Sequence, residues 1–417
     1  MIGFRIKSRT LKDLLKVLSG NIVAQGLGFA TTVLVSRDLG PSEYGIFSLI
    51  LAIFTILVQI SDFGISTSYV KFTSEHLSER REIFTTVLAG KTLLSLIVAL
   101  VAVFGADHIS RFFFDSDKYG ALISLISAAV LFHSIFSTVV AHYQALQNFR
   151  AYSMLKIFHS AMKLLTVVVV SFLFSKEQHI EYFILTYAYT VVLLLFALLY
   201  KNFRYLGGFN KRYLIEIYRL GFWIFLSSIA TMIIMRLDIM MLQKMSTSVE
   251  VGYYSAALNL AMIFPLITAS LVTTLLPKME SFLKQHTIKA YIFKVLSKTK
   301  YVVIVLIMLE LISGYLVEAV YGSGYEGSVT VFRILLFAFI FGVIVNPVSL
   351  VMLSINRAHL LTLLNWIQLP LNYAGNLVFI PLLQAEGAAI STVILRIVGG
   401  AYIIIYLLKA RDYDRET

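Results

Sequence analysis

Twelve apolar stretches, each long enough to cross a lipid bilayer, run through the 417 residues of this chain. A transmembrane helix needs about 20 consecutive apolar residues, because the hydrocarbon core is about 30 Å thick and a helix rises about 1.5 Å per residue. The connections between the stretches are short, which excludes a large domain between them. The predicted spans are 17–37, 44–70, 83–105, 119–147, 151–174, 181–200, 217–243, 251–277, 300–320, 326–354, 359–383 and 387–408.

The amino-acid composition fits a chain that faces lipid along most of its length. Hydrophobic residues make up 59% of the sequence and charged residues 14%, whereas soluble domains contain about 45–50% apolar and about 25% charged residues. A soluble core cannot bury this much apolar surface, so the excess must face lipid. We therefore predict an all-α integral membrane protein with 12 transmembrane helices. The absence of cysteine excludes disulfides and thiolate metal sites.

The basic residues predict the orientation of the chain in the membrane. A net charge of +12 can indicate a nucleic-acid partner, but these residues form short clusters between apolar spans, so we expect no nucleic acid. With a cytoplasmic N-terminus and alternating spans, the inner segments carry 24 of the 35 lysines and arginines, and the outer segments carry five. Because positive charge concentrates in cytoplasmic loops, both termini are predicted to lie in the cytoplasm.

The two halves of the sequence match each other at a constant offset of 207 residues. We expect residues 1–207 and 208–417 to be two six-helix halves that arose by duplication. Chance similarity between apolar helices is the alternative, but it does not easily keep one offset over four helices. Six spans per half give both halves the same orientation, and such parallel repeats place a central cavity for the substrate between them. The matches include Glu43 with Glu250, Gly45 with Gly252, Ser48 with Ser255, and Arg150 with Arg357.

Charged residues inside the predicted spans are more often basic than acidic. A charge in the hydrocarbon core costs about 3 kcal/mol or more, so such residues usually face a bundle interior or a wet cavity. Surplus positive charge there favours an anionic cargo, such as a phosphate or an acidic sugar. The basic residues, our substrate-binding candidates, are Lys91, Lys156, Lys163, Arg236, Arg333 and Arg396. The acidic residues, candidates for ion coupling or ion pairing, are Asp62, Asp238 and Glu310.

Three residues of the fifth span, Lys156, His159 and Lys163, share one helix face because they are spaced at i, i+3 and i+7. Lys163 lies about 20 Å from the cytoplasmic end. This is too deep for its side chain to reach the interface, so we expect it to face a cavity. Lys156 lies about 9 Å from the same end, and for this residue the interface and the cavity both stay open.

The arginines of the second half have competing interpretations. Arg396 lies near mid-depth, where it either binds cargo or forms an ion pair with Glu310. Arg333 lies close enough to the outer surface for its side chain to reach it. Arg236 and Asp238 are two residues apart on one helix and do not face each other, so each is expected to pair with another helix.

Polar stripes on several spans extend the cavity interpretation. Asn21 and Gln25 lie one turn apart on the first span, and we expect both to line the cavity. Hydrogen bonding between packed helices is the alternative for a single stripe, but several stripes together favour a hydrated lumen. The others are Ser228, Thr231 and Asp238 on the seventh span, and Asn365, Gln368, Asn372 and Asn376 on the eleventh.

Enzyme motifs are absent from the sequence. It has no nucleotide-binding P-loop, no zinc-protease helix motif and no nucleophile elbow. We therefore expect no enzymatic activity and no bound cofactor. The energy for transport must then come from an ion gradient, from the cargo gradient or from a partner.

Four short segments carry a resemblance to a known family. They are Leu39–Gly45, Ser61–Ile65, Val251–Ser255 and Tyr321–Tyr325. With the span count and the two halves, they make the chain resemble the polysaccharide-biosynthesis flippases, the Wzx-type translocases of O-antigen or capsule repeat units. That family belongs to the multidrug/oligosaccharidyl-lipid/polysaccharide exporter (MOP) superfamily. Lipid II flippases of this superfamily usually have two further spans.

The resemblance implies a function, a location and partners. Such proteins move an oligosaccharide linked to undecaprenyl pyrophosphate from the cytoplasmic to the outer leaflet of the bacterial inner membrane, by alternating access of a cationic cavity. Coupling to protons or sodium is implied, and Asp62, Asp238 and Glu310 are the intramembrane carboxylates that could serve it. We expect membrane lipid, a polymerase and glycosyltransferases of the same pathway as partners, and a protein that functions as a monomer.

Two other functions stay open on the sequence alone. A cation-coupled multidrug antiporter of the same fold would need acidic residues for cationic drugs, whereas the interior charge here is net positive. A polytopic glycan polymerase or ligase would carry a large outer loop, and the longest predicted outer segment, 106–118, is short. We therefore favour the flippase over both.

Overall fold

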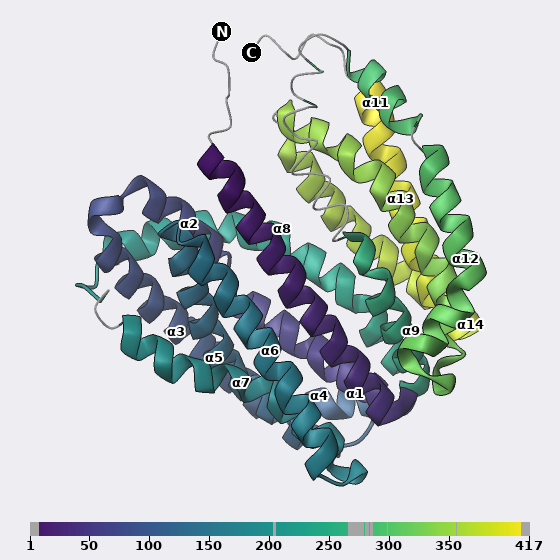
Figure 1. Cartoon of the computed structure of the whole chain (residues 1–417), viewed down its shortest axis with the longest axis horizontal. Coiled ribbons are helices and arrows are strands. Elements are labelled where there is room, and N and C mark those ends of the chain that lie inside the picture. Colours follow the sequence, from purple (N-terminus) through teal and green to yellow (C-terminus); the bar gives the residue numbers. More distant parts are fainter. Residues whose placement is uncertain are drawn as a thin grey trace. The chain divides into compact units, whose positions relative to one another are not determined.

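The computed structural model describes residues 8–202, 206–265, 279, 283, 287–297, 299–355 and 357–409, and every regular element within these ranges is a helix (Figure 1). The first group of α-helices is α1 (Ser8–Asp62), α2 (Ile65–Glu75), α3 (Arg80–Phe104), α4 (Ala106–Phe114), α5 (Gly120–Ala145), α6 (Phe149–Leu173) and α7 (His179–Asn202). The second is α8 (Lys211–Met245), α9 (Ser248–Ala261), α11 (Ile288–Leu296), α12 (Thr299–Tyr321), α13 (Ser328–Ser354) and α14 (Ala358–Lys409). Short 3₁₀ turns lie at Leu77–Glu79, Lys176–Gln178 and Ser323–Tyr325.

The predicted all-α membrane architecture is confirmed. Nine helical stretches in the described residues are long and apolar enough to cross a membrane. Two of them, Lys16–Glu75 and His359–Lys409, each contain two of the predicted spans. The predicted span 251–277 lies partly outside the described residues, since the description stops at residue 265.

Backbone breaks divide the two longest helices where the sequence predicts connections. Gly40 has φ 68° and ψ 173° inside α1, a left-handed φ that glycine adopts without steric cost. Pro41 follows and has no N–H to lose at the start of the next helical stretch. In α14 the break is at Gln384, with φ 52° and ψ −126°.

The chain packs into two units, each with its own core. Unit 1 comprises residues 1–39 and 49–232, and unit 2 comprises residues 40–48 and 233–417. The predicted boundary of the sequence repeat at 207/208 stays a prediction.

In unit 1, α5 is the central helix, and α2, α3, α4, α6 and α7 all pack against it. One apolar cluster joins α2 and α3 to α5 through buried side chains that include Tyr69, Phe84 and Ala141. A second cluster joins α5 to α7 through Phe136, Val139 and Val191, among others. The centre of unit 1 is therefore covered on several sides by helices.

Helices α1 and α6 run parallel in unit 1. A side chain at Gly20 would collide with Ser153, so the absence of a Cβ at Gly20 lets the two backbones approach closely. Further along, Ser171 donates a 2.9 Å hydrogen bond to Asp38. Both pairs are 133 residues apart in sequence, which requires the two helices to point the same way. The predicted first and fifth spans do so if spans alternate in direction.

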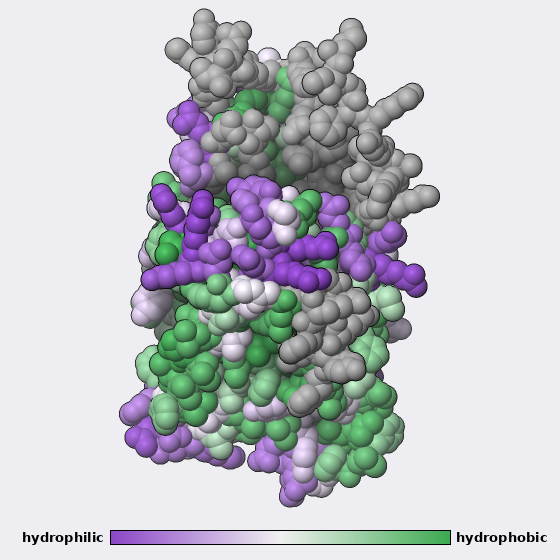
Figure 2. All heavy atoms as spheres, turned by 90° about the vertical axis from the view of Figure 1, so that its left-hand side faces the viewer, coloured by the Kyte–Doolittle hydropathy of each residue, from purple (hydrophilic) through white to green (hydrophobic). Residues whose placement is uncertain are grey.

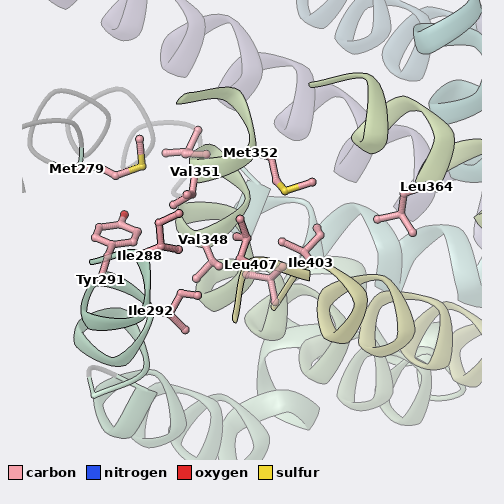
Figure 3. Close-up of a cluster of buried hydrophobic side chains, with 12 residues drawn as sticks. Met279, Ile288, Tyr291, Ile292, Val348, Val351, Met352, Leu364, Ile403 and Leu407 are labelled. Carbon is pink, nitrogen blue, oxygen red and sulfur yellow. The ribbon is translucent and has the colours of Figure 1, made fainter. Parts of the chain in front are cut away.

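In unit 2, α13 is the central helix, and α9, α11, α12 and α14 pack against it. Figure 3 shows the apolar cluster at one end, where the short helix α11 places Tyr291 and Ile292 beside Val348 of α13 and Leu407 of α14. Burial of such side chains is the main favourable term that holds these helices together.

Two glycines that match in the sequence repeat also pack against backbone in unit 2. A Cβ at Gly45 would collide with the carbonyl oxygen of Ser248, and a Cβ at Gly252 would collide with the carbonyl oxygen of Pro41. The start of the second stretch of α1 and the start of α9 therefore lie backbone to backbone. This contact gives a physical role to the glycines of Leu39–Gly45 and Val251–Ser255.

The outer surface of unit 1 carries the apolar side chains expected of a membrane protein. Figure 2 shows green apolar residues in a belt between two purple hydrophilic bands on the side that bears α2 and α3. Exposed side chains of α3 include Leu93, Ile97 and Val101. Because monomeric soluble proteins rarely expose apolar patches of this kind, the belt marks the surface that faces lipid. The chain is a multi-pass membrane protein.

Candidate functional site

Lys163 of α6 lies inside unit 1 without a carboxylate partner in the described part of the chain. Its ammonium nitrogen stands 4.9 Å from the centre of the Tyr187 ring, where the negative face of the ring attracts a cation. The Tyr187 hydroxyl in turn lies 3.5 Å from Thr32 Oγ1 of α1. Three helices therefore position a half-buried cation, and its ammonium protons stay available to an anion.

Two histidines stand beside Lys163. The rings of His133 and His159 meet edge to face at 5.7 Å, and Lys163 interacts electrostatically with both. His133 Nε2 lies 3.0 Å from the carbonyl oxygen of Tyr187, so it carries the proton and donates. The Nε2 of His159 is buried and has no hydrogen-bond partner in the structure. The sequence predicts the common helix face of His159 and Lys163, but not the presence of His133.

Lys156 is hydrogen-bonded to α1 and forms no ion pair with a described residue. Its ammonium group donates a 2.7 Å hydrogen bond to Asn21 Oδ1 and lies 5.2 Å from the ring centre of Tyr152. Asn21 of α1 and Lys156 of α6 therefore meet. Gln25, one turn further along α1, has an exposed side chain.

Lys91 differs from the other basic candidates because all of its hydrogen-bonding capacity is used. It is 1% exposed and forms a 2.6 Å ion pair with Asp62. Ser66 and Ser137 each accept a further bond of 2.7 Å from its ammonium group. An ammonium group has three N–H donors, and all three are occupied. This arrangement fixes the end of α1 to α3 and α5.

A second, half-buried carboxylate of unit 1, Asp38, lies just before the break in α1. Asp38 accepts a hydrogen bond from Ser171 and lies 2.8 Å from Nδ1 of His179. His179 is 2% exposed, and its other ring nitrogen lies 2.9 Å from the carbonyl oxygen of Phe174. Asp38 and Asp62 are thus both engaged by groups other than Lys163.

Unit 2 contains a buried carboxylate whose hydrogen-bond donors, among the described residues, are all uncharged. Asp238 of α8 is 5% exposed. It accepts 2.7 Å hydrogen bonds from Asn376 and from Thr392, and a third bond from the hydroxyl of Tyr254. The remaining oxygen of Asn376 is buried and has no hydrogen-bond partner in the structure. Four oxygen-bearing side chains therefore meet at one point, the chemistry that a proton or a hard cation requires.

Arg396 of α14 lies close to this carboxylate without an ion pair to it in the described residues. Its guanidinium carbon stands 4.4 Å from the centre of the Phe339 ring, and Asp238 and Tyr254 act on it electrostatically. One guanidinium nitrogen lies close to Gly342 of α13, where the missing side chain leaves room. A half-buried guanidinium with free N–H donors suits a carboxylate or phosphate.

Glu310 pairs with Arg333 and not with Arg396. The ion-pair distance is 3.5 Å, and Arg333 also donates a 2.7 Å hydrogen bond to Ser313, which lies between the two. Glu310 is halfway along α12. The structure therefore does not contain the predicted alternative, an ion pair between Glu310 and Arg396. Arg396 remains open to a ligand.

Arg236 is the remaining basic candidate. Its Nε is buried and has no hydrogen-bond partner among the described residues. Tyr44 interacts with it electrostatically. Tyr44 accepts a 2.7 Å hydrogen bond from Asn259 of α9. As predicted from their spacing, Arg236 and Asp238 do not pair with each other in the described structure.

Several residues at these two sites carried no clear sequence signal. Tyr187, Tyr254 and Thr392 are ordinary residues of apolar helices until the fold places them beside a charge. His133 could have been found as an intramembrane titratable residue. The polar stripe of the eleventh span includes Asn376. Its contact with Asp238 is a hydrogen bond between helices, which is the alternative role of such stripes.

Comparison with known proteins places the chain by sequence. The family described as polysaccharide biosynthesis protein matches residues 10–283. A membrane protein of Methanocaldococcus jannaschii, MJ1068, is 20% identical over 425 aligned residues, covering 93% of this chain and 82% of the relative.

Comparison with solved structures places the fold. The lipid II flippase MurJ in an inward closed conformation superposes with a TM-score of 0.79 at 16% identity, covering 95% of this chain and 88% of that one. An inward-facing multidrug resistance MATE family transporter of the MOP superfamily superposes with a TM-score of 0.73 at 13% identity, covering 94% and 96%. At these identities the likeness shows the fold, which is that of MOP-superfamily transporters.

Proposed function

Because the chain belongs to the polysaccharide biosynthesis protein family, we propose that it flips a lipid-linked oligosaccharide across the membrane. The cargo is an oligosaccharide repeat unit on undecaprenyl pyrophosphate, and it moves from the cytoplasmic to the outer leaflet of a bacterial inner membrane. The product is an O-antigen or capsule precursor. The protein acts as a transporter and not as an enzyme.

The observation that carries the proposal is the state of Lys163 and Arg396. Each lies in a membrane-spanning helix, each stands over an aromatic ring, and neither has a carboxylate within ion-pair distance in the described residues. A charge held in that way is costly in a membrane unless it serves a ligand. An ammonium and a guanidinium are the two side-chain groups that bind phosphate oxygens best. Both therefore favour an anionic, pyrophosphate-bearing cargo.

Lys156 adds a positive charge to unit 1, where it donates a hydrogen bond to Asn21 of α1, one turn before Gln25, and Arg236 adds a positive charge to unit 2. In contrast, Lys91 and Arg333 are committed to Asp62 and Glu310. We assign these two pairs to the support of the helices. Alternating exposure of the free cations to the two sides of the membrane would carry the pyrophosphate across while the lipid tail stays in the bilayer.

We further propose that Asp238 binds the coupling ion, a proton or sodium. Its carboxylate is buried, uncharged groups donate its hydrogen bonds, and Asn376 offers an unused oxygen beside it. Binding of a cation there would change the charge of unit 2 and the attraction that Arg396 feels toward Asp238. Asp62 and Glu310 are less suitable because both are already neutralised by a basic partner.

Location and partners follow from the same proposal. Both termini lie in the cytoplasm, as the excess of basic residues in the inner segments indicates. The protein works as a monomer next to the polymerase and glycosyltransferases of the pathway.

One observation favours a cation-coupled antiporter of cationic drugs as a second candidate. Such a protein needs a buried carboxylate that no basic residue neutralises, and Asp238 meets that description within the described residues. Efflux of a cationic dye that stops when the ion gradient collapses would support it. Retention of the dye, together with loss of surface polysaccharide on deletion of the gene, would exclude it.

Complementation tests the proposed function directly. The gene is deleted and restored as wild type, Lys163→Ala, Arg396→Ala or Lys176→Ala, and surface polysaccharide and lipid-linked intermediates are measured. Lys176 is an exposed residue of the 3₁₀ turn before α7, so its variant removes a positive charge without touching either site. We expect the first two variants to lose surface polysaccharide and to accumulate intermediates on the cytoplasmic leaflet. Normal polysaccharide at normal protein levels in both would overturn the proposal.

A further inference from the structure

His159 has a buried hydrogen-bonding atom that no described residue pairs with. Its ring packs against Phe136 at 4.9 Å and against His133 at 5.7 Å, and its Nε2 is buried without a partner. Buried polar atoms are normally hydrogen-bonded, and an orphan atom costs about 1–3 kcal/mol. An unsatisfied nitrogen one turn from the free ammonium of Lys163 therefore points to a ligand that supplies the missing partner.

The groups around His159 show what that ligand must be. The helix α6 itself contributes Lys163 and Lys156, α5 contributes His133, and α7 contributes Tyr187. The residue of α1 that contacts Tyr187 is Thr32, which is uncharged. The described acidic groups of unit 1 nearest in the membrane, Asp38 and Asp62, are bound elsewhere. The environment of His159 thus contains positive and neutral groups, and the charge it lacks is negative.

We propose that Lys163 and His159 together bind the phosphoryl group of the cargo, and that His159 takes up one proton when the group arrives. This deepens the proposed function and rests on it. In the free protein His159 is neutral, because a second positive charge beside Lys163 would be repelled. The arriving phosphoryl oxygens reverse that balance, a proton from the aqueous phase adds to the ring, and Nε2–H donates to an oxygen. When the cargo leaves, the His159 ring returns that proton to the aqueous phase.

His133 is a built-in comparison for this proposal. Lys163 acts on it electrostatically as well, but its Nε2–H is already donated to the Tyr187 carbonyl. It therefore holds Tyr187 under Lys163 and has no free donor at Nε2 for cargo. Removing His133 should shift the position of Lys163 and leave proton uptake in place.

The sign of the pH dependence follows from proton uptake on binding. A ligand whose binding takes up one proton binds more tightly as the pH falls, by about tenfold per pH unit where the free histidine is neutral and the bound one is charged. Phosphates themselves titrate with a pKa of about 6, so the probe must keep a constant charge. Inorganic sulfate has the tetrahedral oxygens of a phosphoryl group and stays a dianion between about pH 6 and pH 8.

The experiment measures sulfate affinity of the full-length protein in detergent at several pH values. As the pH rises, we expect the affinity of the wild type for sulfate to fall about tenfold per pH unit over part of that range. His159→Gln should bind more weakly and show no pH dependence, whereas His133→Gln should keep the slope of the wild type. A flat wild-type profile, or a slope that survives in His159→Gln, would overturn the inference.

Calorimetry of the wild type in two buffers with different ionisation enthalpies gives a second measurement, one that needs no variant to fold. At a pH where the histidine of the free protein is neutral, we expect about one proton to be taken up for each sulfate bound. No proton uptake would overturn the inference. These results separate it from the proposed function. If sulfate binds without a proton while Lys163→Ala still abolishes surface polysaccharide, only the role of His159 fails.

Discussion

Unit 1 and unit 2 hold opposite charges beside the contact that joins their first and last predicted spans. In unit 1, Thr32 of the first span contacts Tyr187 of the sixth, 155 residues later. In unit 2, Asp238 of the seventh span accepts a hydrogen bond from Thr392 of the twelfth, 154 residues later. The same pair of spans is joined in both units. Unit 1, however, has a free cation at this place, and unit 2 has a carboxylate.

This difference shows how two similar helix bundles can take different roles. An ammonium over an aromatic ring, with histidines beside it, suits a phosphate. A carboxylate among hydroxyl and amide oxygens suits a proton or a small cation. If the two sites bind cargo and coupling ion separately, the two bundles need only differ in a few polar side chains, and the apolar faces that hold each bundle together can stay alike.

The largest expected effect separates a structural lysine from a binding lysine within unit 1. Lys91→Ala should lower the free energy of unfolding by about 3–5 kcal/mol, because Asp62 would remain as a charge without its partner. Lys163→Ala should change it by less than about 1 kcal/mol, since no carboxylate loses a partner. Denaturation of both purified variants in detergent measures the difference. Equal losses would show that the two lysines have the same structural role.

A second prediction compares glycines of the two units. Gly252→Ala should destabilise unit 2 by about 1–3 kcal/mol, because the added Cβ meets the carbonyl oxygen of Pro41 and overpacks the contact. Gly28→Ala in unit 1 meets nothing within 4 Å and should be neutral or slightly stabilising, since alanine favours a helix by about 1 kcal/mol over glycine. Thermal unfolding of the two variants checks this. A Gly252→Ala protein as stable as wild type would contradict the close backbone contact.

A third prediction tests whether the carboxylate of unit 2 couples transport to an ion. Asp238→Asn should leave the protein folded, because the amide keeps the shape of the side chain, and flipping should become independent of the ion gradient. Glu310→Gln is the matched control, since it removes a carboxylate already paired with Arg333 and should keep the gradient dependence. Transport with and without an ionophore measures both. Loss of gradient dependence in the control alone would move the coupling site to α12.

A fourth prediction compares one threonine of each unit, Thr32 and Thr392, that contacts a polar side chain. Thr392→Val should cost about 1.5–3 kcal/mol, because its hydroxyl donates to a charged carboxylate. Thr32→Val should cost about 0.5 kcal/mol, because its contact with Tyr187 is long at 3.5 Å and involves neutral groups. Unfolding in detergent resolves the two values. A larger loss at Thr32 would contradict the assignment of the stronger polar network to unit 2.

The sequence predicts the fold well because hydrophobic length is a local signal. The spans around α3, α5, α6, α12 and α13 need only a count of apolar residues, and Gly40 and Pro41 indicate the first break. The break at Gln384 lies between the eleventh and twelfth predicted spans, where the sequence shows only a loss of apolar character.

The site could be predicted only in part, because pairing depends on tertiary contacts. The position of Lys163 deep in its span predicts a cavity role, and in the structure it has no carboxylate partner among the described residues. The sequence could not decide whether cargo or Glu310 is the partner of Arg396. The answer depends on Arg333, which lies 23 residues after Glu310 and forms the ion pair with it. The donors around Asp238 come from α9 and from both stretches of α14, and two of them, Asn376 and Thr392, are 138 and 154 residues away in sequence.

Flipping by the purified protein in liposomes is the most direct test of the central claim. A fluorescent oligosaccharide on undecaprenyl pyrophosphate is placed in one leaflet, and its appearance in the other is followed by a membrane-impermeant quencher. We predict flipping by the wild type and by Lys176→Ala, at least tenfold slower flipping by Lys163→Ala, and partial recovery in Lys163→Arg, which keeps the charge. Equal rates for wild type and Lys163→Ala would contradict the claim that a free cation in unit 1 binds the anionic cargo.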